Sequence, residues 1–332
     1  MTPTTVSPGT STELEKESRI GGAGTETTSR PVRRIDLSDF DARRAEITEE
    51  LWSAATEIGF FQVENHGIDL ADVAEAFAAA ERFFALPAAE KAHFPLQRAL
   101  NAGWEYQSQV RPSIGVPDQK ESYQYTKPNM AGLLPGEDDL PGFAQTVAAF
   151  EAGCWTVAMR ILSCFADRLD LDRDFFARAH DPASATYQST LRMLHYFAVP
   201  PELRDQAGPW RAGAHTDFDC LTLLFQREGQ GGLQVLPGAE METEAWTPVA
   251  PAGDVITCNI GDMLMRWSDD QLPSNFHRVR GPRPGEDQGP RYSMAFFAQA
   301  NTDAVMESAS GAWEPITAGE FLQQRIRANY GG

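Results

Sequence analysis

Residues 213–217 read Gly-Ala-His-Thr-Asp, and they lie in a half of the chain whose pattern is that of short strands. From about residue 186 onward, short apolar runs alternate with Gly and Pro turns. The runs cover residues 191–199, 220–226, 232–236, 254–260, 262–267, 277–280 and 291–299. Many short strands at this spacing predict a double-sheet β-barrel or jelly roll.

The first half of the chain is mostly helical in its spacing. Apolar residues recur at helical intervals over residues 42–58, 70–84 and 142–169. A short strand is predicted at 34–37, with Ser38 as the cap of the following helix, and a second strand at 60–63. These two strands have no sheet of their own. We therefore expect one α+β domain with a mainly β core, a double-stranded β-helix (jelly roll) flanked by N-terminal helices.

The expected organisation has a tail and a single domain. Residues 1–33 are rich in Thr, Ser, Gly and Glu, so they cannot bury enough apolar surface to order themselves, and we expect a disordered tail. The domain is expected to have three parts: a mostly helical part at 34–185, the jelly-roll core at 186–300, and a C-terminal segment at 301–332.

The composition limits the classes of partner that the protein can bind and indicates its cellular compartment. The formal net charge of -19 disfavours nucleic acid and anionic lipid, because like charges repel. No apolar run approaches the roughly 20 residues of a membrane span. The four cysteines form no CxxC pair, and residues 1–33 lack the apolar core of a signal peptide. We expect a cytoplasmic, monomeric protein that binds neither nucleic acid nor a membrane.

His215 and Asp217 are candidate metal ligands. Residues two apart in extended chain face the same side, so both side chains can reach one ion. A third ligand must come from elsewhere, and His277 is the candidate. Two His and one carboxylate form the facial triad of Fe(II) oxygenases, which leaves positions open for a co-substrate and O2. Asp219, at the same strand spacing after Asp217, is a weaker candidate ligand.

Arg291 and Ser293 begin the last strong strand, where Arg291, Ser293, Ala295 and Phe297 share one face. A guanidinium pairs with a carboxylate through two parallel hydrogen bonds, and a hydroxyl beside it adds a third donor. A 2-oxo acid that chelates iron at one end could anchor its far carboxylate there.

The chain resembles the 2-oxoglutarate/Fe(II) dioxygenase superfamily, and within it the isopenicillin N synthase-like family, from about residue 35 to residue 330. Beyond the triad and Arg-x-Ser, the resemblance rests on residues 59–68 (GFFQVENHGI), 83–87 (FFALP), 118–121 (DQKE), 232–236 (GLQVL) and 259–264 (NIGDML). It implies a jelly-roll core and iron at His215, Asp217 and His277. It also implies that Arg291 and Ser293 bind the distal carboxylate of 2-oxoglutarate and that Tyr196 contacts this co-substrate.

The resemblance implies an enzyme that uses Fe(II), 2-oxoglutarate and O2, with ascorbate as a candidate stimulant. It would hydroxylate, desaturate or cyclise a small molecule of secondary metabolism and release succinate and CO2. Asp217 argues against halogenation, because related halogenases lack this carboxylate. Leu194 stands where many plant relatives carry Asn. The resemblance gives residues 118–121 a structural role.

Candidate substrate residues are Arg192, which shares a strand face with Tyr196, together with Phe297 and Arg111. The two arginines point to an anionic substrate. Two other functions remain open at the level of sequence. One is an Fe(II) oxidase of the isopenicillin N synthase type, which does not use 2-oxoglutarate. The other is a non-catalytic sensor of a metal or small molecule on the same barrel.

Overall fold

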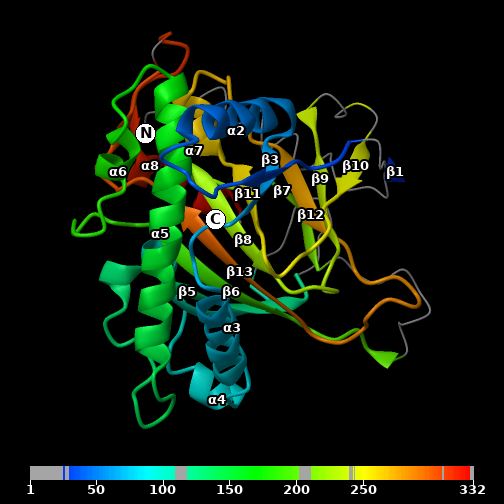
Figure 1. The fold of residues 1–332 in the computed structure, drawn as a ribbon. Coiled ribbons are helices and arrows are strands. Elements are labelled where there is room, and N and C mark those ends of the chain that lie inside the picture. The colour runs from blue at the N-terminus through cyan, green and yellow to red at the C-terminus, as the bar shows by residue number, and fades with distance from the viewer. Residues whose placement is uncertain are drawn as a thin grey trace, which may run out of the picture.

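The computed structural model describes residues 25–26, 30–108, 118–201, 211–238, 242, 244–308 and 310–329. Two sheets face each other, and helices cover the outer side of the larger one (Figure 1). The α-helices are α2 (Arg44–Ile58), α3 (Leu70–Phe84), α4 (Ala88–Lys91), α5 (Phe143–Arg168), α6 (Phe175–Ala179), α7 (Asp262–Trp267) and α8 (Ala318–Asn329). Short 3-10 turns occur at Arg98–Leu100 and Lys127–Asn129.

The major sheet has eight strands. In spatial order they are β2 (Arg34–Asp36), β3 (Phe60–Glu64), β11 (Ile256–Ile260), β8 (Leu221–Gln226), β13 (Arg291–Ala298), β6 (Thr190–Tyr196), β5 (Lys120–Tyr125) and β4 (Gly103–Tyr106). Strands from the first half of the chain therefore extend the barrel sheet at both edges. The early strands find their partners in the barrel: β3 pairs with β11, and β5 pairs with β6.

The minor sheet has five strands. In spatial order they are β1 (Thr25–Glu26), β10 (Ala245–Pro248), β9 (Leu233–Leu236), β12 (Phe276–Val279) and β7 (Ala212–His215). A separate pair, β14 (Val305–Met306) and β15 (Ile316–Thr317), precedes α8. The two facing sheets are those of a jelly roll, and the predicted α+β fold class is confirmed.

The long helix α5 is the centre of the helical layer. It packs against α2, α3 and α6 and against the outer face of β8 and β13 (Figure 1). Phe150 of α5 meets Phe225 of β8 with ring centroids 4.9 Å apart. By length and composition alone α5 could cross a membrane, but 56% of its most apolar window is buried inside the protein. Its apolar residues therefore form the core between helices and sheet.

The structure corrects three local predictions. Residues 262–267 form helix α7 rather than a strand, because the buried Met263, Leu264 and Trp267 follow helical spacing. Helix α2 begins after Arg43, whose side chain makes no cap hydrogen bond, while the Ser38 hydroxyl donates to Asp36 at 2.7 Å. Strand β1 lies within residues 1–33, the range of the expected tail.

Strand β1 is held by charge as well as by pairing. Its backbone lies parallel to β10, and the Glu26 carboxylate lies 2.6 Å from Arg283 and 3.6 Å from Arg280. Charged partners thus replace the apolar contacts that the tail composition lacks. Residues 30–33 are also described, and Gln62 donates its backbone N–H to the Arg33 carbonyl at 2.8 Å. The other residues of the expected tail lie outside the described part of the chain.

Candidate metal centre and co-substrate site

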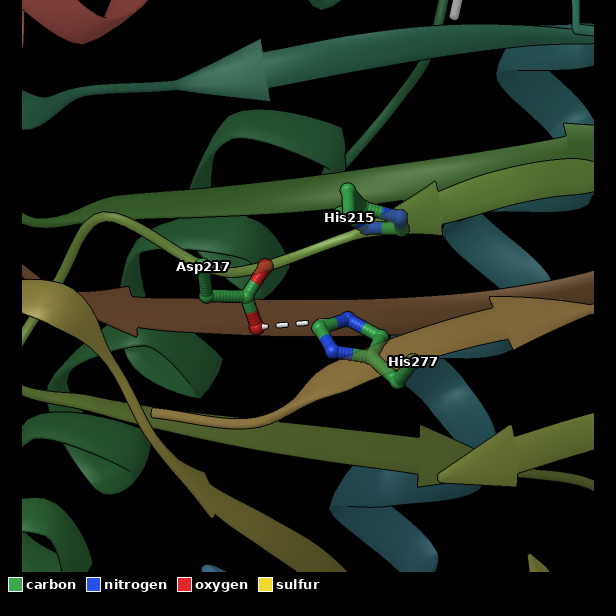
Figure 2. Close-up of side chains that lie close together, drawn as sticks. All are labelled: His215, Asp217 and His277. Carbon is green, nitrogen blue, oxygen red and sulfur yellow. Dashed lines mark ion pairs between the residues drawn. The ribbon is translucent and has the colours of Figure 1, made fainter. Parts of the chain in front are cut away.

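The pairing of β7 with β12 brings the two candidate histidines together. His215 and His277 are direct partners in the antiparallel register, so their side chains share a face. Their ring centroids are 4.3 Å apart. Asp217 follows two residues beyond His215, and its Oδ2 lies 3.7 Å from His277 Nε2 (Figure 2). The candidate ligand atoms of all three residues lie within 4.8 Å of one another. The predicted triad is therefore assembled.

Neighbouring carbonyls orient both imidazoles. His215 Nδ1 lies 2.8 Å from the Gly213 carbonyl, and His277 Nδ1 lies 3.4 Å from the Asn275 carbonyl. A neutral ring that donates from Nδ1 leaves the Nε2 lone pair free for a metal. The Phe60 ring also packs edge-on against His277, with centroids 5.4 Å apart. Backbone and packing thus select one tautomer and one orientation for each ring.

The Asp217 carboxylate is held from the major sheet. Its Oδ2 accepts from Thr222 Oγ1 at 2.6 Å and from Asn259 Nδ2 at 2.8 Å. Thr222 on β8 and Asn259 on β11 are themselves register partners. Because both donors bind Oδ2, Oδ1 remains available to a metal ion. Sequence reasoning does not assign these two residues, although Asn259 begins one of the motifs that carry the resemblance.

Asp219 lies behind Asp217 and outside the triad. It is fully buried, and its Oδ2 lies 2.8 Å from Thr222 Oγ1. Burial and the neighbouring Asp217 raise the pKa of the Asp219 carboxyl well above its ordinary value. The threonine hydroxyl has one hydrogen, so a protonated Asp219 can donate to Thr222 while Thr222 donates to Asp217. Asp219 therefore supports the ligand rather than replacing it.

The loop that carries Asp217 is fixed by the start of α7. The Asp262 N–H donates to the Asp217 carbonyl at 2.8 Å, and the buried Asp262 carboxylate pairs with Arg325 of α8 at 2.5 Å. A Cβ at Gly261 would lie 2.3 Å from the Asp219 carbonyl oxygen. Only glycine allows this close approach. The C-terminal helix is thereby tied to the metal loop.

A cavity of about 130 Å³ lies beside the triad and between the sheets. The predicted co-substrate residues Arg291, Ser293 and Tyr196 line it. Arg291 is 1% exposed; its Nη1 donates to Ser293 Oγ at 3.2 Å and its Nε to the Gln230 carbonyl at 2.9 Å. Its guanidinium lies 4.9 Å from the centre of the Tyr196 ring. Burial lowers the pKa of Arg291, while Tyr196 opposes that change.

Two of the three candidate substrate residues line the same cavity. The Arg192 guanidinium lies 5.1 Å from the centre of the Phe297 ring. Leu194, at the position where many plant relatives carry Asn, is part of the wall between Arg192 and Tyr196. The third candidate, Arg111, lies outside the described residues.

The DQKE motif at residues 118–121 divides between the two faces of β5. Glu121 faces outward, where its carboxylate accepts from Lys91 at 2.7 Å, from Trp104 at 2.7 Å and from His195 at 2.9 Å. That is the structural role which the resemblance implies. Lys120 instead lines the cavity, 2.9 Å from Asp118 Oδ2. The purely structural interpretation of this motif is therefore incomplete.

The donor set fits a non-haem Fe(II) ion. Two imidazole nitrogens and one carboxylate oxygen could hold such an ion from one side and would leave its remaining coordination positions open for a co-substrate and O2. A structural zinc site would instead use four protein ligands and close the coordination sphere. Among the described residues, no other group of three or more His, Cys, Asp or Glu side chains has this arrangement.

Comparison with known proteins agrees with this geometry. The model of the 2OG-Fe(II) oxygenase superfamily matches residues 187–300. The model described as non-haem dioxygenase in morphine synthesis N-terminal matches residues 32–139. Together the two matches cover the jelly-roll strands and most of the preceding helical part.

Similar proteins cover nearly the whole chain. The proline hydroxylase buaE of Petromyces alliaceus is 33% identical over 90% of this chain and 99% of its own length. A full-length Neurospora crassa protein, solved in complex with alpha-KG, has a TM-score of 0.78 at 30% identity, covering 89% of this chain and 95% of that one. The same Neurospora protein with alpha-KG and thymine gives a TM-score of 0.78 at 29% identity, over 90% and 96%. These relatives favour a 2-oxoglutarate-dependent enzyme over a sensor or an oxidase without 2-oxoglutarate. The chain belongs to the 2-oxoglutarate/Fe(II) oxygenase superfamily.

Proposed function

We propose that His215, Asp217 and His277 hold Fe(II), and that Arg291, Ser293 and Tyr196 hold 2-oxoglutarate. The observation that carries the proposal is the register of β7 and β12, which pairs the two histidines beside Asp217 at one end of the cavity. When bound, Fe(II) couples O2 and 2-oxoglutarate to the oxidation of a substrate, with release of succinate and CO2.

The protein's own contribution is binding and orientation. Arg291 offers a planar pair of N–H groups to the distal carboxylate of 2-oxoglutarate, and Ser293 a hydroxyl beside them. Apolar side chains from both sheets form the wall between this end and the metal: Leu194, Ala212, Leu224, Leu233, Val279 and Ala295. A wall without hydrogen-bonding groups excludes water from the reacting centre.

We further propose that the substrate is a small anionic molecule held by Arg192 against Phe297. Arg192 Nε is buried without a hydrogen-bond partner among the described residues. An unsatisfied guanidinium N–H in a cavity favours a ligand that brings an acceptor, and a carboxylate is the strongest one. The position of the substrate carbon relative to the metal decides between hydroxylation, desaturation and cyclisation.

An anaerobic titration tests the metal and co-substrate assignments. Adding 2-oxoglutarate to the Fe(II)-loaded protein is expected to produce a visible charge-transfer band, and admitting O2 with substrate is expected to release succinate. Absence of both would remove the assignment of iron and 2-oxoglutarate to this cavity.

A substrate panel scored by succinate release tests the anionic class. It pairs small carboxylic acids with their neutral amides and includes thymine, the ligand of the Neurospora relative. We expect turnover of acids only, and Arg192→Met to raise the KM of the best acid by about 10-fold or more. Arg227→Met is the matched control, because Arg227 pairs with Glu81 away from the cavity. Turnover of amides or thymine at the rate of the acids would refute the anionic class.

We also propose a cytoplasmic monomer. Four unpaired, buried cysteines support a reducing compartment. Fractionation of cells and size-exclusion chromatography with light scattering test the two statements. Recovery with a membrane or exported fraction, or the mass of a dimer, would contradict them.

A further inference from the structure

We propose that Lys120 is a second cation for the distal carboxylate of 2-oxoglutarate, opposite Arg291 across the Tyr196 ring. The inference rests on the proposed function of the cavity and deepens it. The family resemblance gives the motif around Lys120 a structural role only, and the proposed function assigns no ligand to this lysine.

The register of three adjacent strands places Lys120 in line with the co-substrate residues. Lys120 of β5 is the partner of Tyr196 on β6, and Tyr196 is the partner of Arg291 on β13. Partners across a sheet share a face, so the three side chains form one row on the inner side. The Lys120 ammonium lies 6.0 Å from the centre of the Tyr196 ring, and the Arg291 guanidinium 4.9 Å from it. All three line the cavity.

Buried cations outnumber buried carboxylates at this end of the cavity. Lys120, Arg211 and Arg291 are 5%, 6% and 1% exposed. Among the described residues, Asp118 is the one carboxylate within hydrogen-bond distance of any of them, and it binds Lys120. The buried Glu105 carboxylate is a second negative charge that acts on Lys120 from further away. Arg211 donates to the Gly289 carbonyl and Arg291 to Gln230 and Ser293. Burying a cation without an anion costs free energy, so an anionic group bound at this end of the cavity would be stabilised.

The pKa values of Arg211 and Arg291 are both lowered, as expected for buried cations that lack a nearby anion. Burial and the neighbouring Arg291 lower the pKa of Arg211 to about 10, against weaker support from Tyr196 and Asp287. Burial also lowers the pKa of Arg291. A bound carboxylate would offset the like-charge repulsion between them.

Asp118 binds the Lys120 ammonium but accepts only one of its hydrogen bonds. Asp118 Oδ2 accepts from Lys120 at 2.9 Å, and Asp118 Oδ1 accepts from the Gly213 N–H at 3.4 Å. This contact ties β5 to β7, the strand of the first metal ligand. An ammonium has three N–H groups, and no acceptor besides Asp118 is found for Lys120 in the described part of the chain. Two donors therefore remain for a ligand.

The position of Lys120 separates it from the substrate end. Arg192 is the register partner of Gln124, four residues further along β5. Four residues of a strand span about 13 Å, so Lys120 and Arg192 lie at different ends of the inner face. A ligand of Lys120 is therefore the one anchored by Arg291.

The test is equilibrium binding to the Fe(II)-loaded protein without O2. Two ligands are compared: 2-oxoglutarate, and 2-oxopentanoate, which has a methyl group in place of the distal carboxylate. We expect Lys120→Met to raise the Kd of 2-oxoglutarate by about 10- to 100-fold and to leave that of 2-oxopentanoate within about twofold. Lys120→Arg, which keeps the charge, is expected to retain most of the 2-oxoglutarate affinity.

Lys91→Met is the matched control, because it makes the same change at a buried lysine on the outer face of the sheet. Its 2-oxoglutarate Kd is expected to stay at the wild-type value. Equal weakening of both ligands by Lys120→Met would show a purely structural role and overturn the proposal. So would a change below about threefold for 2-oxoglutarate, or an effect confined to substrate KM. If the wild-type protein gives no 2-oxoglutarate-dependent band, it is the proposed function that fails.

Discussion

Replacing Thr222 by Val should weaken iron binding although Thr222 is not a ligand. The change removes a hydroxyl at nearly constant volume from the donor that holds Asp217 Oδ2 at 2.6 Å. Asn259 Nδ2, at 2.8 Å from the same oxygen, remains in the single variant. Asn259 alone then orients the Asp217 carboxylate, which can rotate about this single hydrogen bond.

The expected size of the effect follows from the contacts. A hydrogen bond to a charged group contributes about 1.5–3 kcal/mol, and residues that orient a metal ligand typically change metal affinity by about 10- to 100-fold. Because one donor remains, we expect the lower end, a rise in the Fe(II) Kd of about 10-fold. Thr222→Val combined with Asn259→Leu should approach about 100-fold or more, since Oδ2 then has no donor among the described residues.

The assay is anaerobic competition for Fe(II) against a coloured chelator. Thr257→Val is the control, because Thr257 is equally buried in the same sheet but contacts Gln62 rather than Asp217. Thr222→Val also leaves Asp219 without its partner, so its Tm is measured and binding is compared well below it. An Fe(II) Kd within twofold of the wild type in both variants would refute the view that Thr222 orients the ligand.

Three further predictions concern the ligands and their neighbours. His277→Ala should abolish iron binding and turnover; normal iron stoichiometry would remove His277 from the triad. Arg291→Gln should raise the KM for 2-oxoglutarate by about 10-fold or more and that for substrate far less; an unchanged KM would reassign the arginine. Glu105→Gln should lower the KM of an anionic substrate a few-fold, because it removes a carboxylate beside Arg192. Steady-state kinetics compare this KM with that of a neutral analogue, whose KM is expected to stay unchanged.

The Glu105 prediction depends on that carboxyl group being ionised. Although burial opposes ionisation, Arg192 and the hydroxyls of Ser108 and Ser122 hold the pKa of Glu105 below its usual range. Its Oε1 accepts from Ser122 at 2.6 Å and from Gln124 at 2.9 Å. A negative charge fixed in this way competes with an anionic substrate for Arg192.

Helices with clear boundary signals can be predicted closely from the sequence. The apolar spacing predicts a helix over 70–84, and helix α3 is observed at Leu70–Phe84, where Asp69 caps its first turn. The same approach does not predict strand β5, although all six of its residues are buried. Only Tyr123 and Tyr125 among them are apolar, so a search for apolar runs passes over this strand. Hydrogen bonds such as that of Ser122 to Glu105 offset the cost of burying its polar residues.

The three proposed metal ligands could be picked out because they carry a local signal, an HxD pair and a later His of the same family pattern. The residues that support them carry none. Thr222 and Asn259 act together only because β8 pairs with β11 in the register that places them opposite each other. Lys120 meets Tyr196 and Arg291 only through the register of three strands. Long-range pairing of this kind is not encoded in any short stretch of the chain.

The two sheets contribute different parts of the centre, and this explains why it depends on the whole fold. The minor sheet supplies the histidines through the pairing of β7 with β12. The major sheet supplies the donors to Asp217 from β8 and β11. Asp217 lies in the chain segment that leads from β7 to β8, so it is the residue on which both sheets act. A shift of either register by one residue would turn a ligand or its support to the opposite face, and the metal centre would be lost while most of the core remained.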